Sequence, residues 1–530
     1  MKIQKISTSL LLALFMPLWL CGQTGNTDLN MVYQIKQEGS RNSKIEELAF
    51  GLTDFVGPRL TGSTGSNRGN DWAKKKMEEL GFQNVRIEEA GDFSRGGWDN
   101  VKTYAAMVAP YYANFACNPV AWTGSTKGLV RGEVIMVDVR SESDLEKYKG
   151  TLGGKIVMMP STSTTPYEIS FEPLASRYTE DQLKELTRES LQSGRRQGGQ
   201  PYDLNAMMSQ RQLRTKITDL LKSEGVAVIL NNSGTYNIPR SGFAGFNAAT
   251  GAEPIAELNI PMEAFGRMER LIRNKVPVEM EIEIKNNFFA SPKVFNVIGE
   301  IPGTDKLLKN EVVLLGAHID SYHGGTGAAD NASGCIVMIE ALRILKALNV
   351  SPKRTIRVAL WGGEEQGLYG SRGYASKYLV DASNNQNKPD FDKFAVYFNM
   401  DNGSGQYRGI YLQGNEMARP VFEEWLKPFE GLGCSTITIR NTGGTDHQTF
   451  DRYGLPAFQF IQDEIEYDRG YHTVMDTYER LVMNDLKVNA IITATLAYNA
   501  AMSAEKLPRK PVTQQQGAGR GGPGGMPPGM

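Results

Sequence analysis

The chain has few cysteines, and their number limits how covalent cross-links could stabilise it. The four cysteines are Cys21, Cys117, Cys335 and Cys434, with no short-range spacing between them. Removal of an N-terminal leader would leave three, so we expect no disulfide framework and one pair at most. A chain of 530 residues is long enough for a sizeable hydrophobic core. We therefore expect the core, and not disulfides, to stabilise the fold.

Neither sign of charge is in excess. Lys and Arg together number 58, Asp and Glu number 59, and the net charge is -1. Electrostatic binding of phosphate backbones needs a basic surface, so we expect no nucleic-acid partner.

Long apolar runs are also lacking. Residues 10–20, LLLALFMPLWL, follow Lys2 and Lys5, contain Pro17 and are too short to span a bilayer. This pattern predicts a signal peptide over residues 1–22 and a secreted or periplasmic protein without a transmembrane span. Lipid anchoring at Cys21 is the alternative, which the bulky Leu20 before it disfavours.

The first half of the chain changes character at about residue 118. Residues 28–90 have apolar side chains at helical spacing and are predicted to be helical. From residue 118 to residue 288, short apolar runs and the alternating stretch VEMEIEIK predict strands, while residues 178–223 are charged and predict a helical insertion. We therefore expect a mainly β domain over 118–288, inserted into a discontinuous domain formed by 28–117 and 289–505.

The second half alternates between strand and helix. Such alternation predicts an α/β fold with a mixed, mostly parallel sheet sandwiched by helices. The Gly/Pro-rich residues 506–530 are expected to be disordered. The expected strands are 294–301, 311–320, 355–361, 394–401 and 456–461, and the expected helices include 333–348 and 415–429.

Polar side chains follow several of these expected strands. His318, the adjacent Glu364 and Glu365, and Asp401 each come at or just after the end of an apolar run. The carboxyl ends of strands in an open α/β sheet are where ligands bind, so these side chains can converge. Singly, each is more commonly a turn, cap or structural residue. Together with Asp330 and His472 they form a nitrogen and oxygen donor set that suits zinc or a similar divalent metal.

The local sequences around these residues resemble those of the di-zinc exopeptidase family that includes leucyl-type aminopeptidases, plasma glutamate carboxypeptidase (carboxypeptidase Q) and the transferrin receptor. The resemblance covers roughly residues 30 to 505, and residues 118–288 resemble the protease-associated domain that many members carry. The stretches that carry it are GAHIDS, GAADNASG, WGGEEQGLYGS, NMDN, TDHQTF and YHTVMDT, with GPRLTGS near the N-terminus.

The resemblance implies two zinc ions and a role for each ligand. His318 and Asp401 would bind one Zn²⁺, Glu365 and His472 would bind the other, and Asp330 would bridge the two.

It also implies two further roles. Glu364 would be the general base and would face the attacking water. Asp320 would accept a hydrogen bond from the far nitrogen of His318 and fix its tautomer, as Asp476 would for His472.

One stretch departs from the family pattern. Where several aminopeptidases carry an oxyanion-stabilising tyrosine, this chain has Thr442, and Thr445 replaces the serine of the following motif. Stabilisation of the oxyanion would then rest on zinc, on backbone N–H groups near Gly443 and Gly444, or on His447. Asp446 and His447 lie near the substrate or are structural, and His323 is expected in a loop at the pocket mouth.

Three functions remain open. The first is a zinc exopeptidase acting on short peptides, which would need a carboxylate near the free amine of an aminopeptidase substrate or a cation near the terminal carboxylate of a carboxypeptidase or dipeptidase substrate. The second is glutaminyl cyclisation with a single zinc, and the third is a binding protein on an inactive scaffold. The resemblance to the carboxypeptidase Q branch also implies a homodimer. Candidate cations are Arg372, Arg440 and Arg469.

Overall fold

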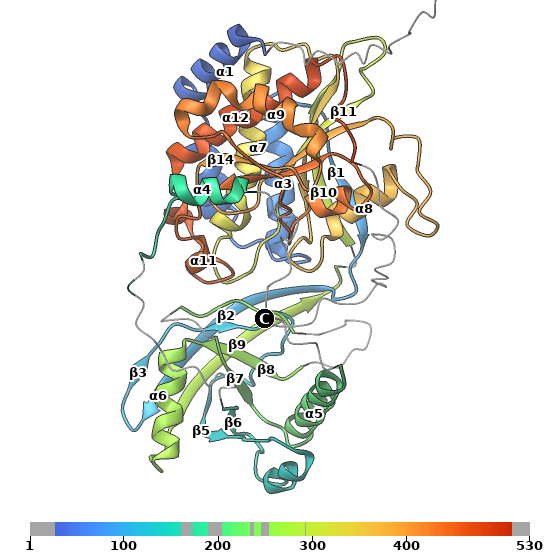
Figure 1. Ribbon diagram of the computed structural model, residues 1–530. Helices are drawn as coiled ribbons and strands as arrows, with labels where there is room; N and C mark the ends of the chain where they lie inside the picture. Colours follow the sequence, from blue (N-terminus) through green and yellow to red (C-terminus); the bar gives the residue numbers. More distant parts are fainter. Residues whose placement is uncertain are drawn as a thin grey trace, which may run out of the picture.

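The computed structural model describes residues 27–160, 171, 173–188, 204–233, 238–244, 254–291 and 293–510. The chain forms two eight-stranded sheets, which lie one above the other in Figure 1 with helices packed against each. The expected signal peptide over 1–22 lies outside the described residues. Among the described residues, no helix is both long and apolar enough to cross a membrane.

The first sheet has the strand order β1-β10-β12-β11-β13-β16-β14-β15, and four of its seven strand pairs are parallel. Its central strands are continuous apolar runs because helices cover both faces. In β11, Leu315 faces the larger core cluster and Leu314 faces a smaller one on the other side. The strands are β1 (Gln83–Asp92), β10 (Lys293–Ile301), β11 (Val312–His318), β12 (Thr355–Trp361), β13 (Phe394–Asn399), β14 (Tyr407–Tyr411), β15 (Thr436–Thr438) and β16 (Ala457–Gln462).

Helices enclose this sheet from both sides. The larger core cluster joins the sheet to α1, α2, α7, α9 and α12, whereas α8 and α10 pack on the opposite face. Both α7 and α12 are apolar around most of their circumference, which explains why most of their residues are buried. The helices and helical turns are α1 (Leu29–Arg41), α2 (Ile45–Phe50), η1 (Gly51–Phe55), α3 (Thr64–Glu79), η4 (Ala328–Ala332), α7 (Ser333–Ala347), α8 (Tyr369–Tyr378), η5 (Glu416–Ala418), α9 (Arg419–Leu426), η6 (Lys427–Leu432), α10 (His447–Asp451), α11 (Tyr467–Gly470), η7 (Tyr478–Arg480) and α12 (Met483–Met502).

The second sheet has the order β3-β2-β9-β5-β6-β7-β8-β4 and contains three parallel pairs. Side chains alternate across it: Ile156 and Met158 pack with α6, and Val157 between them packs with α5 on the other face. Its elements are β2 (Gly97–Ala109), β3 (Ala113–Asn114), β4 (Asn118–Pro119), β5 (Val130–Met136), η2 (Glu142–Tyr148), β6 (Ile156–Met158), α5 (Leu204–Ser223), β7 (Val228–Asn232), β8 (Ala256–Ile260), α6 (Met262–Arg273) and β9 (Glu279–Phe289).

This arrangement confirms the expected α/β class but changes the expected inserted domain. The insertion is itself a mixed α/β unit, because α5 and α6 cover opposite faces of its sheet. It begins at Gly97, well before residue 118, because β2 pairs along most of its length with β9. Residues 83–90 are also not helical, since β1 pairs with β10 at the edge of the first sheet.

The predicted helical insertion over 178–223 does not stay together. Within the described part, α4 (Glu180–Thr187) packs on β15 of the first domain, while α5 packs in the second. The expected tail also begins too early at 506, because Leu507 is buried and Lys510 pairs with Asp451 at 2.6 Å. Cys117, Cys335 and Cys434 are free thiols, in line with the expected lack of a disulfide framework.

Candidate active site

Four neighbouring parallel strands of the first sheet end at the same edge. They are β12, β11, β13 and β16, in that order. His318 is the last residue of β11, Asp401 follows β13, and the Glu364–Glu365 pair follows β12. His472 follows β16 after the short helix α11. The carboxyl ends of adjacent parallel strands therefore bring these side chains into one site.

The His318 imidazole lies at the centre of one group of contacts. Its Nε2 is 3.1 Å from Asp330 Oδ1 and 3.3 Å from Asp401 Oδ1. Its Nδ1 lies 3.0 Å from the backbone carbonyl of Asp320 and 3.6 Å from the carboxylate of the same residue. The ring is almost completely buried. Asp320 therefore faces the far nitrogen of His318, mainly through its carbonyl.

The His472 imidazole forms a second group. Its Nε2 is 2.9 Å from Glu365 Oε2 and 3.2 Å from Asp330 Oδ2. Asp330 thus directs one carboxylate oxygen to each imidazole. This is the arrangement that a carboxylate bridging two cations would need.

The turn after β12 separates the two adjacent glutamates. Gly362 passes so close to the strand beside it that a Cβ there would lie 2.3 Å from the Phe295 carbonyl oxygen, and Gly363 has a positive φ of 69°. The backbone N–H groups of Glu364 and Glu365 donate to the Asp320 carboxylate at 3.1 and 3.3 Å. Asp320 therefore holds the turn that presents both glutamates.

Negative charge dominates the electrostatics of the site. Burial by itself lowers the pKa of His318, but Asp401, Asp320 and Asp330 outweigh it and hold that pKa well above its ordinary value. His472 behaves in the same way, and Glu365 with Asp330 raises its pKa to about 10. Burial raises the pKa of Glu365 to about 7 and that of Glu364 well above its ordinary range. The cluster therefore favours added positive charge.

These residues fit a divalent metal ion. His318, Asp330 and Glu365 offer ligand atoms within 4.8 Å of one another. Glu365 Oε1 is buried and has no hydrogen-bond partner in the part of the chain that the structure describes. Imidazole nitrogens with carboxylate oxygens form a donor set that zinc accepts.

Three further residues that the sequence placed near the site, Asp476, Asp446 and His447, take different positions. Both Asp476 oxygens accept from backbone, at 2.6 Å from Ala329 N and 3.0 Å from Asp330 N, so Asp476 orients the central aspartate and not the ring of His472. Asp446 is fully buried, and burial raises its pKa to about 7 against the pull of His318. The His447 Nε2 lies 3.1 Å from the Thr442 carbonyl, and burial lowers the pKa of that ring to about 4.

Several neighbours of the site were not anticipated. The Thr61 hydroxyl donates to Asp320 Oδ2 at 2.9 Å. Tyr322 lies 4.1 Å, centroid to centroid, from His472, and Tyr471 stacks on the same ring at 3.6 Å. Tyr467 is partly buried, and a Cβ on Gly403 would lie 2.7 Å from its ring. The density of tyrosines around the two histidine motifs was the available signal for them.

The candidate cations do not converge on the cluster. Arg440 donates to the Glu185 carbonyl at 2.7 Å, and Arg469 pairs with Glu466 at 3.4 Å. Arg372 is exposed on α8, with Asp446 among the charges that act on it. His323, expected at the pocket mouth, lies where the two domains meet, with its Nε2 2.7 Å from the Pro119 carbonyl.

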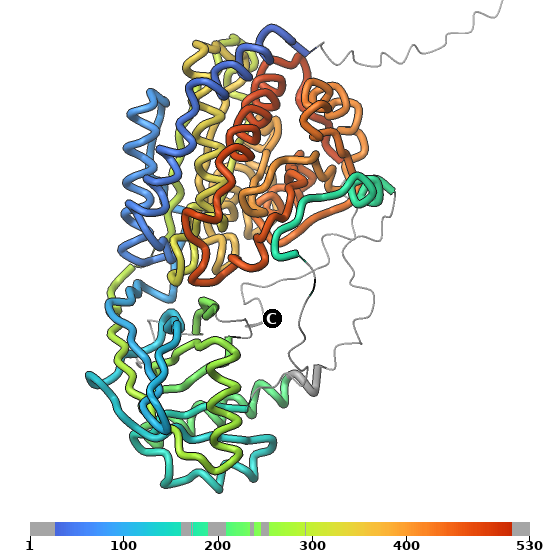
Figure 2. Tube along the Cα trace, turned by 90° about the vertical axis from the view of Figure 1, so that its left-hand side faces the viewer, coloured from blue at the N-terminus to red at the C-terminus, as the bar shows by residue number. Residues whose placement is uncertain are grey.

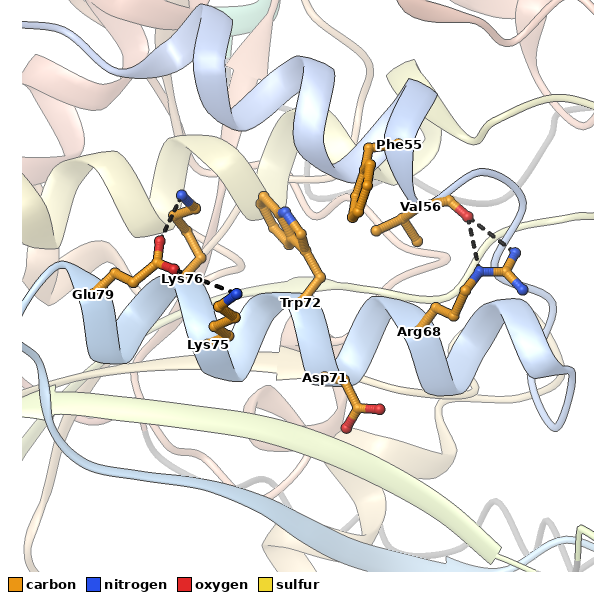
Figure 3. A pocket seen from close by; sticks show the side chains of 8 residues that line it. All are labelled: Phe55, Val56, Arg68, Asp71, Trp72, Lys75, Lys76 and Glu79. Atoms are coloured by element: carbon orange, nitrogen blue, oxygen red, sulfur yellow. Dashed lines mark hydrogen bonds and ion pairs between the residues drawn. The ribbon is translucent and has the colours of Figure 1, made fainter.

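A surface cavity of about 450 Å³ lies elsewhere, between η1 and α3 (Figure 3). Phe55 and Trp72 face each other across it, and Lys76 pairs with Glu79 at its rim. None of its eight lining residues is a histidine or belongs to the cluster. This cavity therefore does not coincide with the cluster of histidines and carboxylates.

Comparisons with known proteins converge on one family. Residues 296–497 match the model of peptidase family M28. Carboxypeptidase Q from Homo sapiens is 24% identical over 495 residues, which cover 92% of this chain and 91% of that protein. Among solved structures, a peptidase M28 precursor from Shewanella amazonensis is 22% identical with a TM-score of 0.63, covering 91% of this chain and 98% of that one. A zinc aminopeptidase from Bacillus subtilis is 18% identical with a TM-score of 0.52, covering 87% and 95%. The two solved structures share the fold of this chain.

Proposed function

The chain belongs to peptidase family M28, and from that premise we propose that it is a zinc-dependent exopeptidase that hydrolyses short peptides at two bound Zn²⁺ ions. His318 and Asp401 would hold one ion and His472 and Glu365 the other, with Asp330 shared between them. We further propose that it is exported by the signal peptide over 1–22, that the inserted domain is of the protease-associated type, and that the chain forms a homodimer.

One observation carries the proposal of two metals. Asp330 Oδ1 lies 3.1 Å from the His318 imidazole, and Asp330 Oδ2 lies 3.2 Å from the His472 imidazole. A site for one ion would not need a carboxylate shared between two separate imidazole and carboxylate pairs. The same complete set of donors argues against glutaminyl cyclisation with one zinc and against an inactive scaffold.

The chemistry divides between the metal and the protein. When bound, Zn²⁺ supplies a Lewis acid for the peptide carbonyl and makes water easier to deprotonate. Glu364 lies beside the ligand Glu365 in a buried site, and its carboxylate takes a proton from the attacking water and delivers it to the leaving amine nitrogen. Asp320 keeps Glu364 directed into the site by accepting the N–H groups of the turn.

Two adjacent isosteric substitutions test this function. Glu364→Gln should leave zinc content per chain unchanged and reduce peptide hydrolysis by roughly 10²- to 10⁴-fold, because it removes only the proton carrier. Glu365→Gln should reduce zinc content, measured by elemental analysis, and lose activity as a consequence. Glu281→Gln on β9, in the second sheet, is the matched control and should change neither.

Hydrolysis that survives Glu364→Gln would refute the assignment of the base. Failure of the zinc-loaded wild-type protein to cleave a broad set of free dipeptides would refute the exopeptidase function itself.

A further inference from the structure

Arg95 lies where the chain crosses from the first sheet to the second. It is in the short connection between β1 and β2 and is partly buried. The return crossing, between β9 and β10, runs beside it, because β1 pairs with β10 and β2 pairs with β9 (Figure 2). Arg95 is thus held between the domain that carries the site and the domain that faces it.

Aromatic rings hold the guanidinium in place. Its Cζ lies 4.7 Å from the ring centroid of Phe243 and 5.3 Å from that of Trp122. One guanidinium N–H donates to the Ala244 carbonyl. Stacking of this kind fixes the plane of an arginine without neutralising its charge.

Within the described residues, no carboxylate pairs with Arg95. Burial lowers its pKa, and the hydroxyls of Tyr369 and Tyr322 oppose this effect. Two other arginines of the chain have acidic partners: the buried Arg343 pairs with Glu340 at 2.7 Å, and the partly buried Arg408 pairs with Asp463 at 3.1 Å. A buried guanidinium can instead be satisfied by backbone carbonyls, as Arg59 is by five of them, but Arg95 donates to one. A partly buried cation with neither a carboxylate nor a full set of acceptors is costly unless an anion joins it.

The rings around Arg95 lead to the site. Phe243 stacks on Tyr322 with centroids 6.0 Å apart and planes at 23°, and Tyr322 in turn lies 4.1 Å from His472. Glu365 acts electrostatically on the Tyr322 hydroxyl. On the other side, Tyr369 packs against the turn that carries both glutamates, since a Cβ on Gly363 would lie 3.0 Å from the Cβ of Tyr369. Arg95 therefore lies at the rim of the site, one aromatic layer out from the ligands.

We propose that Arg95 binds the free terminal carboxylate of the substrate peptide, so that the site reads the carboxyl end of a short peptide. The inference rests on the proposed peptidase function and adds a specificity residue to it. An arginine presents several N–H donors in a planar fork that matches both oxygens of a carboxylate. Phe243 and Tyr322 link Arg95 to His472, and each extended residue spans about 3.3–3.6 Å, so a short peptide that extends along these rings from the proposed metal ligands carries its terminal carboxylate toward Arg95.

The experiment compares one dipeptide in three forms: free, amino-acetylated and carboxyl-amidated. For the wild-type protein, kcat/KM should be highest for the two forms with a free carboxylate. Arg95→Gln should lower kcat/KM for these forms by roughly 10- to 100-fold, the range expected for a lost charged hydrogen bond, and leave the amide nearly unchanged. Arg95→Lys should fall between the two because it keeps the charge but not the fork.

Two arginines serve as controls. Arg131→Gln removes an exposed arginine of β5 that pairs with Glu279, and it should leave all three rates unchanged. Arg372→Gln removes the exposed arginine of α8, which lies on the first domain near Asp446. If Arg372→Gln, and not Arg95→Gln, abolishes discrimination between the free acid and the amide, the inference is overturned.

The remaining outcomes distinguish a failure of the carboxylate-binding role of Arg95 from a failure of the peptidase function. Equal losses on free and amidated substrates for Arg95→Gln would overturn the carboxylate-binding role and leave the peptidase function intact. The same holds if the wild-type protein cleaves the amide as fast as the free acid, a comparison that requires no variant to fold. If wild type and Glu364→Gln are equally inactive on every form, the peptidase function itself fails.

Discussion

The two sheets of this molecule share an arrangement but not a chemistry. Each has four adjacent parallel strands: β12, β11, β13 and β16 in the first sheet, and β5, β6, β7 and β8 in the second. Two histidines and several carboxylates follow the strands of the first. Within the described residues of the second, Glu257 of β8 accepts a hydrogen bond from Asn231 at 3.0 Å, and no metal-binding cluster forms. Parallel topology therefore provides an edge, and the residues after the strands decide whether it becomes a site.

A matched pair of carboxylate-to-amide substitutions, one in each sheet, should show most clearly that the chemistry belongs to the first sheet. Asp330→Asn weakens the carboxylate that both imidazoles contact, so we expect hydrolysis to fall by more than roughly 100-fold, since even residues behind the ligands affect metal affinity by 10- to 100-fold. Glu257→Gln should leave hydrolysis unchanged. Rates and zinc content of the two purified variants provide the measurement.

We also expect a direction for the effect of Glu257→Gln on the free energy of unfolding. Burial raises the pKa of Glu257, so in the folded protein its carboxylate is disfavoured, and stability from this group declines as pH rises through that pKa. At neutral pH the amide should be neutral to slightly stabilising, within about 1 kcal/mol. A strong loss of activity in Glu257→Gln would contradict the assignment of chemistry to the first sheet alone.

Arg59 provides the next largest expected effect. Its guanidinium is fully buried and is held by backbone carbonyls instead of a carboxylate. Arg59→Met should lower the free energy of unfolding by about 3–5 kcal/mol, because buried carbonyls lose their donors. The exposed Arg131→Met in the second sheet should cost less than about 1 kcal/mol. The carbonyls that accept from Arg59 belong to Leu52, Gly57, Ile319, Thr326 and Gly327.

Urea unfolding with and without zinc checks this prediction. The acceptors Ile319 and Thr326 lie on the segments that lead from His318 and into Asp330, so the loss should be larger in zinc-loaded protein. An equal loss in both forms would show that Arg59 supports the fold but not the site.

The fold of the first domain was largely predictable from the sequence. Buried parallel strands such as 312–318 and 355–361 are continuous apolar runs, and the expected boundaries lie within a few residues of β11 and β12. The family resemblance was also readable, because its motifs are local stretches of sequence, and the M28 match over 296–497 confirms it.

Three other features of the structure depend on contacts between residues far apart in the sequence and could not be predicted from it. Three of the five carbonyls that accept from Arg59 lie more than 250 positions away, and GPRLTGS offers no local pattern that indicates them. The split of 178–223 between two domains arises because Arg177 and Tyr178 bond to Asp463, and nothing in the periodicity of α4 indicates that partner. The position of Arg95 likewise depends on how two sheets meet.

Acidification should lower the stability of the contact between the two domains at His323. Burial lowers the pKa of His323 to about 4, and its Nε2 donates to the Pro119 carbonyl in the second domain. The unfolded chain takes up the proton first, near pH 6.5, so the contribution of His323 to stability is full above that pH and is lost as pH falls toward 4. Partial exposure of the ring reduces the expected loss to about 1–3 kcal/mol.

His323→Gln should flatten this part of the stability profile. Urea unfolding of wild type and variant at pH 7, 5.5 and 4.5 isolates the contribution, because His447, which also has a lowered pKa, remains in both. Parallel profiles for the two proteins would mean that folding does not lower the pKa of the His323 ring.

The smallest expected effect concerns the strap formed by residues 173–188, which leaves the second domain and packs on the first. Arg177 joins it to Asp463 at 2.8 Å and to Asp485 at 2.7 Å, but its side chain is 47% exposed. Arg177→Gln should therefore cost only about 1 kcal/mol, because Asp463 keeps Arg408 at 3.1 Å and the Tyr178 N–H at 3.0 Å. Limited proteolysis should cut the strap faster in the variant while hydrolysis of dipeptides stays the same, since the strap has no contact with the proposed metal ligands in the described residues. A fall in activity together with faster cutting would instead place the strap over the site. It would also make the second domain part of catalysis, although its described residues form no metal-binding cluster.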